Sequence, residues 1–177
     1  INQYRLHRGY HYPRSVETVL SCIEGEKQFT EAYAGAVLKS NKHYYCISKE
    51  NSLTSDIEFE KLCKNNGLDL KITSPKIINN NSISKSYEVH EYLFDPFKLK
   101  NLIKEKLKYY NVQLRLNREI TREELSDYDA VVIATYSSNN QFFDNDNYVK
   151  KTFQFELCEK VVVKLPDQFK NSSVVII

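Results

Sequence analysis

Most of the side chains that could do chemistry gather in one stretch, RLHRGYHYPRS, at residues 5–15. It contains two of the four histidines, three of the six arginines and one of the four glycines of the chain. Histidine exchanges a proton near neutral pH, so His11 and His7 are candidate proton acceptors. Arginine holds a carboxylate through two hydrogen bonds, which makes Arg14 and Arg8 candidate substrate ligands. The alternative is that the stretch at 5–15 has no chemical role and is a polar turn that leads into a helix.

A zinc site is a further interpretation of the same stretch. His7 and His11 are four residues apart, and on a helix they would share one face, as paired zinc ligands do. Gly9 and Pro13 oppose a helix here. No obvious third ligand accompanies the pair, although His90–Glu91 is possible. We therefore predict no metal.

Length, composition and charge exclude several classes of protein. The chain has 177 residues, 41% hydrophobic and 27% charged, which is typical of a soluble domain with a core. Its net charge is +2, so nothing indicates nucleic-acid binding. No apolar run approaches the roughly 18 residues of a membrane span, and no segment resembles a signal peptide. We expect a cytoplasmic protein whose partner is a small molecule.

Cysteine, methionine and glycine usage narrows the interpretation further. Cys22, Cys46, Cys63 and Cys158 are widely spaced, which favours free thiols in a reducing compartment over disulfides. The chain contains no methionine, so we expect a fragment or a processed product. Its four glycines are too dispersed for a P-loop or a G-x-G-x-x-G fingerprint. A nucleotide site would have to be completed elsewhere.

Local signals predict the first helices. Ser15 is a plausible N-cap, and apolar residues at helical spacing follow it. We expect a break at Gly25 and a second helix over 29–36. SDIE, at 55–58, has the spacing of a capping box, and Gly67 is placed to end that helix.

Two more helix starts follow later in the chain. Asp95 followed by Pro96 supplies a capping side chain and then proline in the first turn. The apolar register continues from there, with Lys106 beside the apolar stripe. TREE, at 121–124, matches a capping box and predicts a single helical turn.

Runs of apolar, β-branched and aromatic residues predict the strands. The expected strands cover 43–48, 68–73, 87–94, 112–116, 129–135, 152–157, 159–165 and 174–177. The run DAVVIAT, at 129–135, has five consecutive apolar residues, as does a central parallel strand covered on both faces. Residues 137–147 look like a connection between two domains or two sheets. The pattern predicts an α/β fold in which a nucleotide-type module is interleaved with a mostly antiparallel sheet.

Three segments occur in an order that resembles one family of flavoproteins. They are the stretch at 5–15, DPFKLKNLIKEKLKYYNVQLRLN at 95–117, and YDAVVIAT at 128–135. Together they resemble the FAD-dependent oxidoreductases of the D-amino-acid oxidase/glycine oxidase superfamily, over roughly residues 2–140. In that family a G-x-G-x-x-G unit opens the chain. The resemblance therefore implies a fragment that lacks this unit.

The resemblance also implies a division into domains and an activity. A partial FAD/NAD(P)-binding, Rossmann-like domain would comprise 1–40 and 95–140, and a partial β-rich substrate domain would comprise 41–94 and 141–177. The whole protein would oxidise a small amine, amino acid or hydroxy acid by hydride transfer to flavin N5. The chain by itself would be inactive and would bind FAD weakly, because the helix N-terminus that holds the pyrophosphate is missing.

Carried over by position, the resemblance assigns roles to ten residues. Those implied to contact the cofactor, first along the flavin and then at the adenine and pyrophosphate, are Arg5, Leu6, His7, Gly9, Ile120, Ala134 and Thr135. Those implied on the substrate side, as catalytic candidates, are His11, Tyr12 and Arg14. One position departs from the family. Its glycine after Ala-Thr, which allows close backbone approach to phosphate, is Tyr136 here.

Two other functions remain open at this point. A non-catalytic α/β module could present a ligand at the carboxyl end of the 129–135 strand. An adenosyl-methionine-dependent methyltransferase could contain a similar strand, although a glycine-rich first loop is absent. The flavoprotein hypothesis makes a structural prediction of its own. The segments 112–116 and 129–135 should not pair as neighbours, because two other strands separate them in the family.

Overall fold

The computed structural model describes residues 4–39, 41–143, 152–154 and 159–177. The chain divides into two compact units. The first comprises residues 1–112 and 162–177, and the second comprises residues 113–161. Among the described residues, no helix has the length and apolar character that crossing a membrane requires.

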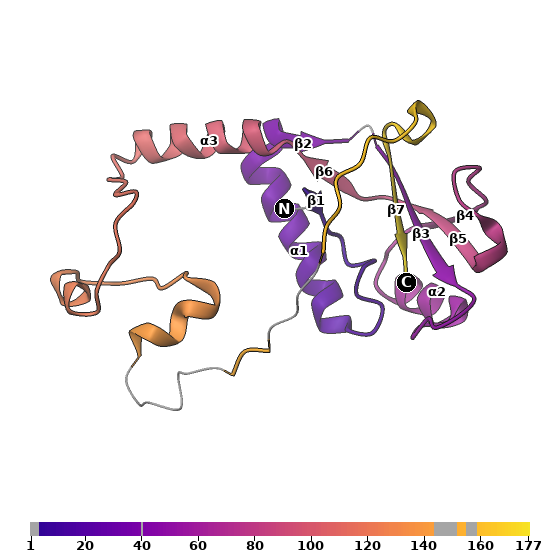
Figure 1. Ribbon diagram of the computed structural model, residues 1–177, viewed down its shortest axis with the longest axis horizontal. Coiled ribbons are helices and arrows are strands. Elements are labelled where there is room, and N and C mark those ends of the chain that lie inside the picture. Colours follow the sequence, from indigo (N-terminus) through magenta and orange to yellow (C-terminus); the bar gives the residue numbers. More distant parts are fainter. Residues whose placement is uncertain (1–3, 40, 144–151, 155–158) are drawn as a thin grey trace. The chain divides into compact units, whose positions relative to one another are not determined.

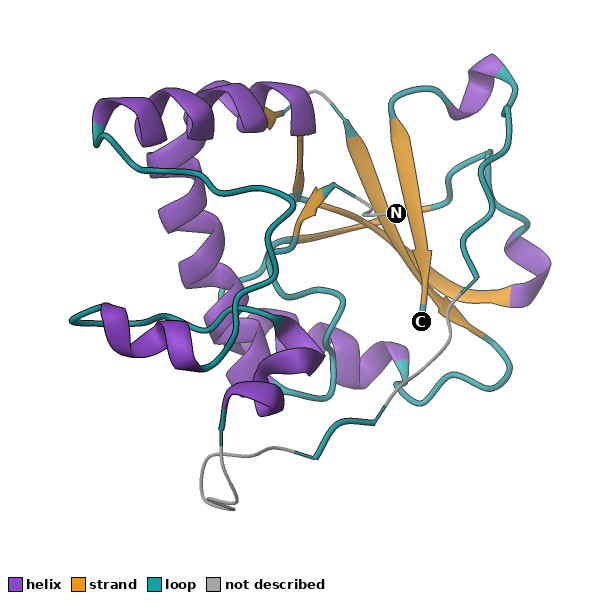
Figure 2. Ribbon diagram, turned by 60° about the vertical axis from the view of Figure 1, so that its left-hand side comes forward, coloured by secondary structure: helices purple, strands orange, loops and turns teal. Residues whose placement is uncertain are grey.

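A four-stranded sheet forms the centre of the first unit (Figure 1). Its order is β4-β5-β3-β7, and these strands are Leu70–Thr73, Ile83–Val89, Lys42–Ser48 and Ser172–Ile176. The pairs β4–β5 and β5–β3 are antiparallel, whereas β7 lies parallel to β3 (Figure 2). The described part of the chain therefore has the predicted mixed α/β class, with one antiparallel and one mixed sheet.

A second, three-stranded sheet places the start of the N-terminal stretch. Its order is β1-β6-β2, and these strands are Arg5–Leu6, Tyr92–Phe94 and Val37–Leu38. Arg5 pairs with Leu93 and Leu6 with Tyr92 in antiparallel register. Because side chains alternate across a strand, Glu91 lies on the same face as Leu93. The register therefore sets Arg5 diagonally across from Glu91.

The first helix, α1, runs without interruption over Val16–Tyr33. Ser15 caps it as predicted, because its side chain accepts a hydrogen bond from the Thr18 amide. The expected break at Gly25 is wrong. A single glycine costs a helix about 1 kcal/mol, and tertiary packing on both sides of it is sufficient to offset that cost. The expected second helix is the end of α1 followed by a short 3₁₀ turn, Ala34–Ala36.

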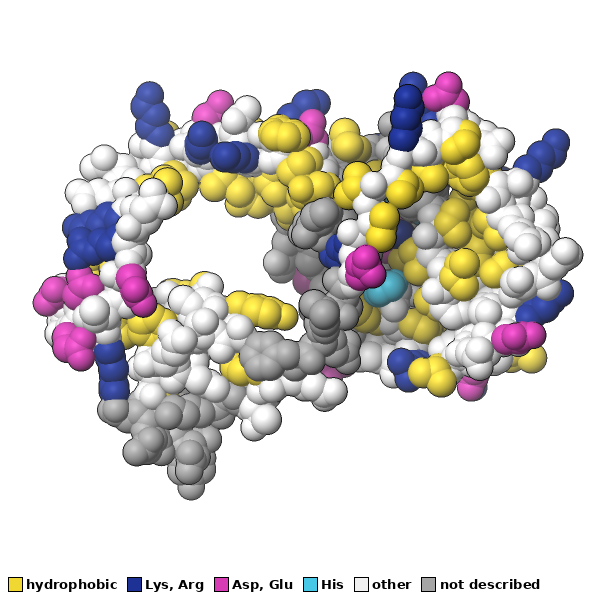
Figure 3. All heavy atoms as spheres, viewed as in Figure 1, with side chains coloured by type: hydrophobic (Ala, Val, Ile, Leu, Met, Phe, Trp, Pro, Cys, Tyr) yellow, Lys and Arg dark blue, Asp and Glu magenta, His cyan; other side chains and the backbone are white. Residues whose placement is uncertain are grey.

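Helices α2 and α3 begin where the capping signals predict, and α2 also ends as predicted, just before Gly67. In α2, Asp56–Asn65, Ser55 and Glu58 form a complete capping box, and Gly67 follows the helix at φ +67°. In α3, Pro96–Tyr109, the Asp95 carboxylate accepts hydrogen bonds from the Phe97 and Lys98 amides. Figure 3 shows basic side chains along one side of α3 and apolar ones along the other.

The core of the first unit is rich in aromatic rings. Tyr10, from the N-terminal stretch, packs against Tyr45 of β3 at a ring distance of 5.6 Å. Phe59 of α2 packs against Tyr87 of β5 at 5.3 Å. All four side chains are fully buried, together with Val19 of α1. The N-terminal stretch is thus part of the folded core, not a loose polar turn.

Several expected strands are not formed. Residues 112–116 and 129–135 lie outside every strand of the described chain, and so do the described residues of 152–157 and the segment 159–165. The strand assigned to 87–94 is instead the end of β5 followed by β6. A strand needs a neighbour for its backbone hydrogen bonds, and the segment 129–135 has no such neighbour here. The Val132 side chain of this segment is 92% exposed. The segments 112–116 and 129–135 do not pair with each other.

The second unit contains short 3₁₀ segments. One of them, Glu123–Asp127, replaces the predicted turn of helix at TREE. Half of the capping box is present there, because the Glu124 carboxylate accepts a hydrogen bond from the Thr121 amide. Another, Tyr136–Phe142, occupies most of the described part of the expected connection, and 144–147 lie outside the described residues. The assignment of interleaved cofactor and substrate domains stays a prediction.

Candidate functional site

The N-terminal stretch folds around one buried carboxylate, that of Glu91, which is 3% exposed. Arg5 Nη2 donates to Glu91 Oε2 at 2.5 Å, and the Arg8 backbone amide donates to Oε1 at 3.1 Å. The Tyr45 hydroxyl donates to Oε2 at 3.2 Å from the neighbouring sheet. Glu91 thereby joins the stretch at 5–15, the turn between β5 and β6, and the central strand β3.

Glu91 is ionised at neutral pH. Burial by itself raises the pKa of this carboxyl, but nearby donors outweigh it. The His7 side chain, the Arg5 guanidinium and the Arg8 amide lower the pKa to about 2. A charge this deeply buried is stable only because it is paired and hydrogen-bonded. The charge of Arg5 is largely neutralised within the protein by the same contact.

His7 lies between this carboxylate and solvent. Its Nδ1 is 3.7 Å from Glu91 Oε1, too far for a hydrogen bond but close enough for electrostatic orientation of the ring. The His7 side chain is 27% exposed. A carboxylate on the Nδ1 side of an imidazole orients the ring and leaves Nε2 pointing away, where it can face a substrate. Of the two histidines in the stretch, His7 therefore has the better placed partner.

His11 and Tyr12 complete a ring cluster with His7. The ring centroids of His7 and His11 are 5.4 Å apart, and that of Tyr12 is 5.9 Å from His7. Burial, His7 and Arg5 lower the pKa of His11, and Glu91 opposes them only in part. His11 is therefore neutral near pH 7 and can donate or accept a hydrogen bond. The structure thus brings His7, His11 and Tyr12 together.

The remaining predicted cofactor ligands of this stretch face inward. Leu6 is 9% exposed, and Gly9 is buried at φ +109°. A Cβ at Gly9 would lie 2.9 Å from Cγ1 of Val19, so glycine here permits close packing on α1. Through their side chains, Arg5, Leu6 and Gly9 position the stretch. These three residues could offer a ligand their backbone atoms. The neighbouring, half-exposed His7 could offer its side chain.

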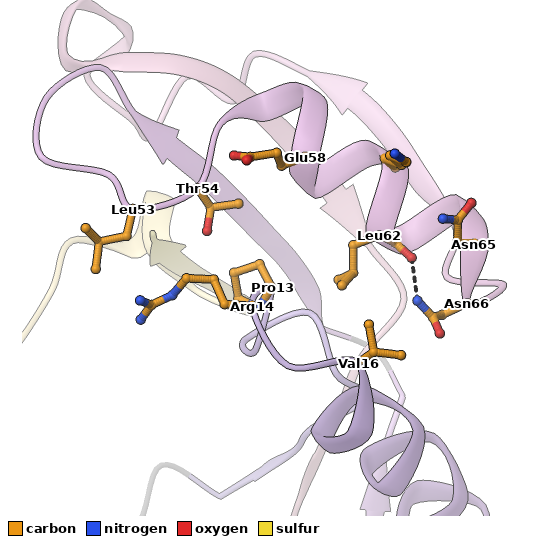
Figure 4. A pocket seen from close by; sticks show the side chains of 10 residues that line it. Pro13, Arg14, Val16, Leu53, Thr54, Glu58, Leu62, Asn65 and Asn66 are labelled. Atoms are coloured by element: carbon orange, nitrogen blue, oxygen red, sulfur yellow. Dashed lines mark hydrogen bonds between the residues drawn. The ribbon is translucent and has the colours of Figure 1, made fainter.

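Arg14 lies apart from the ring cluster. Together with Pro13 it lines a hollow of about 470 Å³ beside α2, and none of the three clustered rings lines that hollow (Figure 4). Arg8, the other candidate carboxylate ligand, has its Nε 4.0 Å from Glu26 Oε2. The hollow that Arg14 lines therefore includes neither of the predicted proton acceptors, His7 and His11.

The predicted adenine and pyrophosphate contacts meet in the second unit. Ile120, Ala134 and Thr135 line one hollow of about 340 Å³. The other lining residues are predominantly apolar and include Leu125 and Tyr128. The Thr135 amide and hydroxyl both donate to Asn139 Oδ1, at 2.8 and 2.7 Å, which fixes the end of the apolar segment. Ile120 and Thr135, which are 15 positions apart in the sequence, thus line the same hollow.

Tyr136, which occupies the position of the family's glycine, has φ 57°. This left-handed conformation favours glycine and is uncommon for a bulky side chain. The backbone therefore turns as glycine would allow, although the residue is a tyrosine. Its side chain is 86% exposed, so the ring leaves the turn open.

Sequence reasoning missed the residue on which the site depends. The sequence pattern marks Glu91 only as a possible metal ligand and gives Tyr45 no role. The available signal was an acidic residue between two expected strand segments, although its partner was 86 positions away. Among the described residues, no group of three or more histidine, cysteine, aspartate or glutamate side chains could hold a metal ion. His43 is buried, at 1% exposed, and His90 is exposed.

Comparison with known proteins gives a distant similarity to two flavoenzymes. The chain is 29% identical over 124 residues to the FAD-dependent monooxygenase kojA of Aspergillus flavus. It is equally similar to the probable FAD-dependent monooxygenase kojA of Aspergillus oryzae. Each alignment covers 67% of this chain and 29% of the relative, so the chain spans less than a third of the length of these proteins. No family model and no solved structure matches.

Proposed function

We propose that this chain forms part of a FAD-dependent oxidoreductase. The observation that carries the proposal is the similarity to two proteins named as FAD-dependent monooxygenases. The narrower assignment to the D-amino-acid oxidase/glycine oxidase superfamily rests on the order of the three segments described above. We therefore also propose, on the same grounds, that the whole protein catalyses the D-amino-acid oxidase type of reaction on the substrates of that superfamily.

The N-terminal stretch has hydrogen-bond donors to spare, as a flavin site requires. Arg5 Nε, His7 Nδ1 and Arg8 Nε are buried and have no hydrogen-bond partner among the described residues. Buried donors are normally paired, so each such atom calls for an explanation. Of these groups, the half-exposed His7 side chain, together with backbone atoms of the stretch, could face the carbonyl and ring nitrogen acceptors of an isoalloxazine. We propose that the stretch from Arg5 to Gly9 lies along the flavin.

The hollow in the second unit, taken by itself, has the character of an adenine site. Its apolar walls suit an adenine ring, and Ile120 would offer backbone groups to it. Ala134 and Thr135, just before the turn at Tyr136, would approach the pyrophosphate. The φ of 57° at Tyr136 supports this assignment, because it is a conformation that glycine adopts readily.

The flavin, when bound, would accept a hydride at N5 from the carbon of a small amine, amino acid or hydroxy acid. The protein must then manage the proton on the substrate nitrogen or oxygen. We propose that His7 Nε2 takes this proton, because Glu91 lies on the Nδ1 side of the ring and the His7 side chain is partly exposed. His11, whose pKa is lowered, would hydrogen-bond the substrate in its neutral form, and Tyr12 would supply a ring face.

The test uses the complete product of the gene that encodes this chain. We expect it to purify with one FAD per chain, and anaerobic addition of amino or hydroxy acids should bleach the flavin. His7→Gln should slow the bleaching by about 10²–10⁴-fold. His90→Gln is the matched control, because His90 is exposed and bonds Tyr92 instead. A protein without flavin would refute the proposal. Unchanged bleaching in His7→Gln would refute the role of His7.

A further inference from the structure

A hollow of about 470 Å³ lies beside α2, at the end of the N-terminal stretch. Its volume is within the range of small-molecule sites. Arg14 and Lys61 bring two positive charges to it, and Pro13, Val16, Leu53 and Leu62 form its apolar walls. Figure 4 shows Arg14 and Leu53 on one side of the hollow, with Leu62 and Val16 pointing toward each other on the other side.

Glu58 is the one acidic residue in the lining, and the two cations still leave the hollow a net charge of +1. Glu58 belongs to the capping box of α2, where its Oε2 accepts from the Ser55 amide at 2.8 Å and from the Ser55 hydroxyl at 2.7 Å. These bonds lower the pKa of Glu58, so it stays ionised and committed to the cap. Within the described part of the chain, neither Arg14 nor Lys61 has an ion pair or a side-chain hydrogen bond. The positive charge of the hollow is thus available to a ligand.

The backbone holds Arg14 in a defined position. Pro13 restricts the turn before it, and Ser15 directly after it caps α1. Two backbone hydrogen bonds close this turn, from the Tyr12 amide to Gly9 at 3.0 Å and from the Ser15 amide to Tyr12 at 3.1 Å. A guanidinium on a fixed backbone loses less conformational entropy when it binds a planar anion.

The walls of the hollow favour a ligand with an apolar body. Leu53 is 74% exposed and Val16 is 51% exposed, and both line the hollow. Covering these side chains with an apolar group removes their surface from water, which is favourable. Polar groups at the far side are partly committed, because Asn66 Nδ2 donates to the Leu62 carbonyl at 2.8 Å (Figure 4). An uncharged polar ligand gains little here.

We infer that this hollow binds a small organic anion: a carboxylate carried on an apolar body. The carboxylate contacts Arg14, with Lys61 as the second cation, and the body lies against Leu53, Val16 and Leu62. This site differs from the proposed flavin site, because it contains none of the ring cluster of His7, His11 and Tyr12. Its occupation needs no flavin, so it holds whether or not the chain belongs to an oxidoreductase.

The test is a titration of the 177-residue chain with benzoate, followed by NMR of backbone amides. We expect saturable shifts at the residues around the hollow. Benzyl alcohol, which keeps the ring and lacks the charge, should bind at least about tenfold more weakly. Acetate, which keeps the charge and lacks the ring, should also bind more weakly. Arg14→Gln should weaken benzoate binding about tenfold or more.

Matched variants test the charged side and the apolar side of the hollow separately. Lys61→Gln should weaken benzoate binding, whereas Lys64→Gln, on the same helix but outside the lining, should leave it unchanged. Leu53→Ser should weaken benzoate binding and leave acetate binding unchanged. All four substitutions are at exposed positions, so the variants should remain folded, which their amide spectra would show. Undetectable benzoate binding, equal binding of benzyl alcohol, or full binding by Arg14→Gln would each overturn the inference.

Discussion

Arg5 and Glu91 form an ion pair whose side chains are 5% and 0% exposed, with Arg5 Nη2 2.5 Å from Glu91 Oε2. The pair ties β1 to the turn before β6, and it places His7 in front of the same carboxylate. Two charges in such a position are stable only as a pair. The contact is therefore both a structural anchor and the electrostatic centre of the candidate site.

Removing one partner of this pair should be strongly destabilising. We expect Glu91→Gln to lower the free energy of unfolding by about 3–5 kcal/mol, because the Arg5 charge stays buried without a counter-ion. Urea denaturation measures the change. Glu88→Gln is the matched control, since its partner Lys71 is 3.9 Å away and 77% exposed, and it should change stability by less than about 0.5 kcal/mol. Similar small losses in both variants would contradict the anchoring role of Glu91.

His43 should make folding sensitive to mild acid. Its Nδ1 bonds the Ser173 hydroxyl at 2.7 Å between β3 and β7. Burial, together with Arg5, lowers its pKa to about 4 although Glu91 opposes the shift. The unfolded chain binds a proton near pH 6.5 and the folded chain does so near pH 4. Stability should therefore fall as the pH drops from about 6.5 to about 4, by at most about 1.4 kcal/mol per pH unit from this residue.

The variant His43→Gln should remove that contribution to the slope, whatever its effect on stability at neutral pH. His90→Gln should retain the slope, because His90 is exposed. The measurement is the free energy of unfolding in urea at intervals between pH 7 and pH 4. An identical slope in His43→Gln and the unmodified chain would show that another group titrates.

Two glycines should respond to alanine in opposite directions. Gly9→Ala introduces a Cβ 2.9 Å from Val19 Cγ1 at a φ of +109°, so it should cost about 1–3 kcal/mol through overpacking and backbone strain. Gly25→Ala meets no atom within 4 Å and lies inside α1. It should stabilise the protein by about 0.5–1 kcal/mol through helix propensity. Thermal unfolding of both variants would reveal the signs, and a neutral Gly9→Ala would contradict the close packing on α1.

The turn at Tyr136 should distinguish residues by their tolerance of a positive φ. Tyr136→Gly should be tolerated, whereas Tyr136→Val should destabilise the turn by about 1–2 kcal/mol, because β-branched residues are strained at φ 57°. Tyr128→Val is the control at an extended backbone, φ −124°, and should be accepted. Amide hydrogen exchange over residues 120–143 reports the local effect. Equal exchange rates in the three variants would argue against strain at Tyr136.

Short-range signals predicted the helix starts, because an N-cap is decided within four residues. Ser15, Ser55 and Asp95 each bond an amide two or three positions ahead, as their sequence contexts indicate. The strands at 112–116 and 129–135 were predicted wrongly, since a strand also needs a partner and composition does not reveal one. The candidate site was predicted in part. The stretch at 5–15 was recognised from its residue types, but Glu91 becomes its centre only through the pairing of β1 with β6.

The same difference between local signals and long-range packing explains which of the predicted ligand residues remain available to a cofactor. Gly9 and Arg5 looked available to a cofactor in the sequence, yet the fold uses their side-chain positions for packing and for the ion pair. Ile120 and Thr135 looked unrelated except through the resemblance, yet the second unit brings them to one hollow. Residue types indicate which chemistry is available. Long-range packing decides which groups remain free to perform it.

Flavin content tests the central claim most directly. The complete gene product and the 177-residue chain should be titrated with FAD, and binding should be followed by the quenching of flavin fluorescence. We predict one tightly bound FAD per complete protein, and weak or no binding by the chain alone, because its dispersed glycines provide no phosphate-binding fingerprint. A complete protein that binds no FAD would contradict the proposed class. A stoichiometric complex of FAD with the isolated chain would contradict the division of the site.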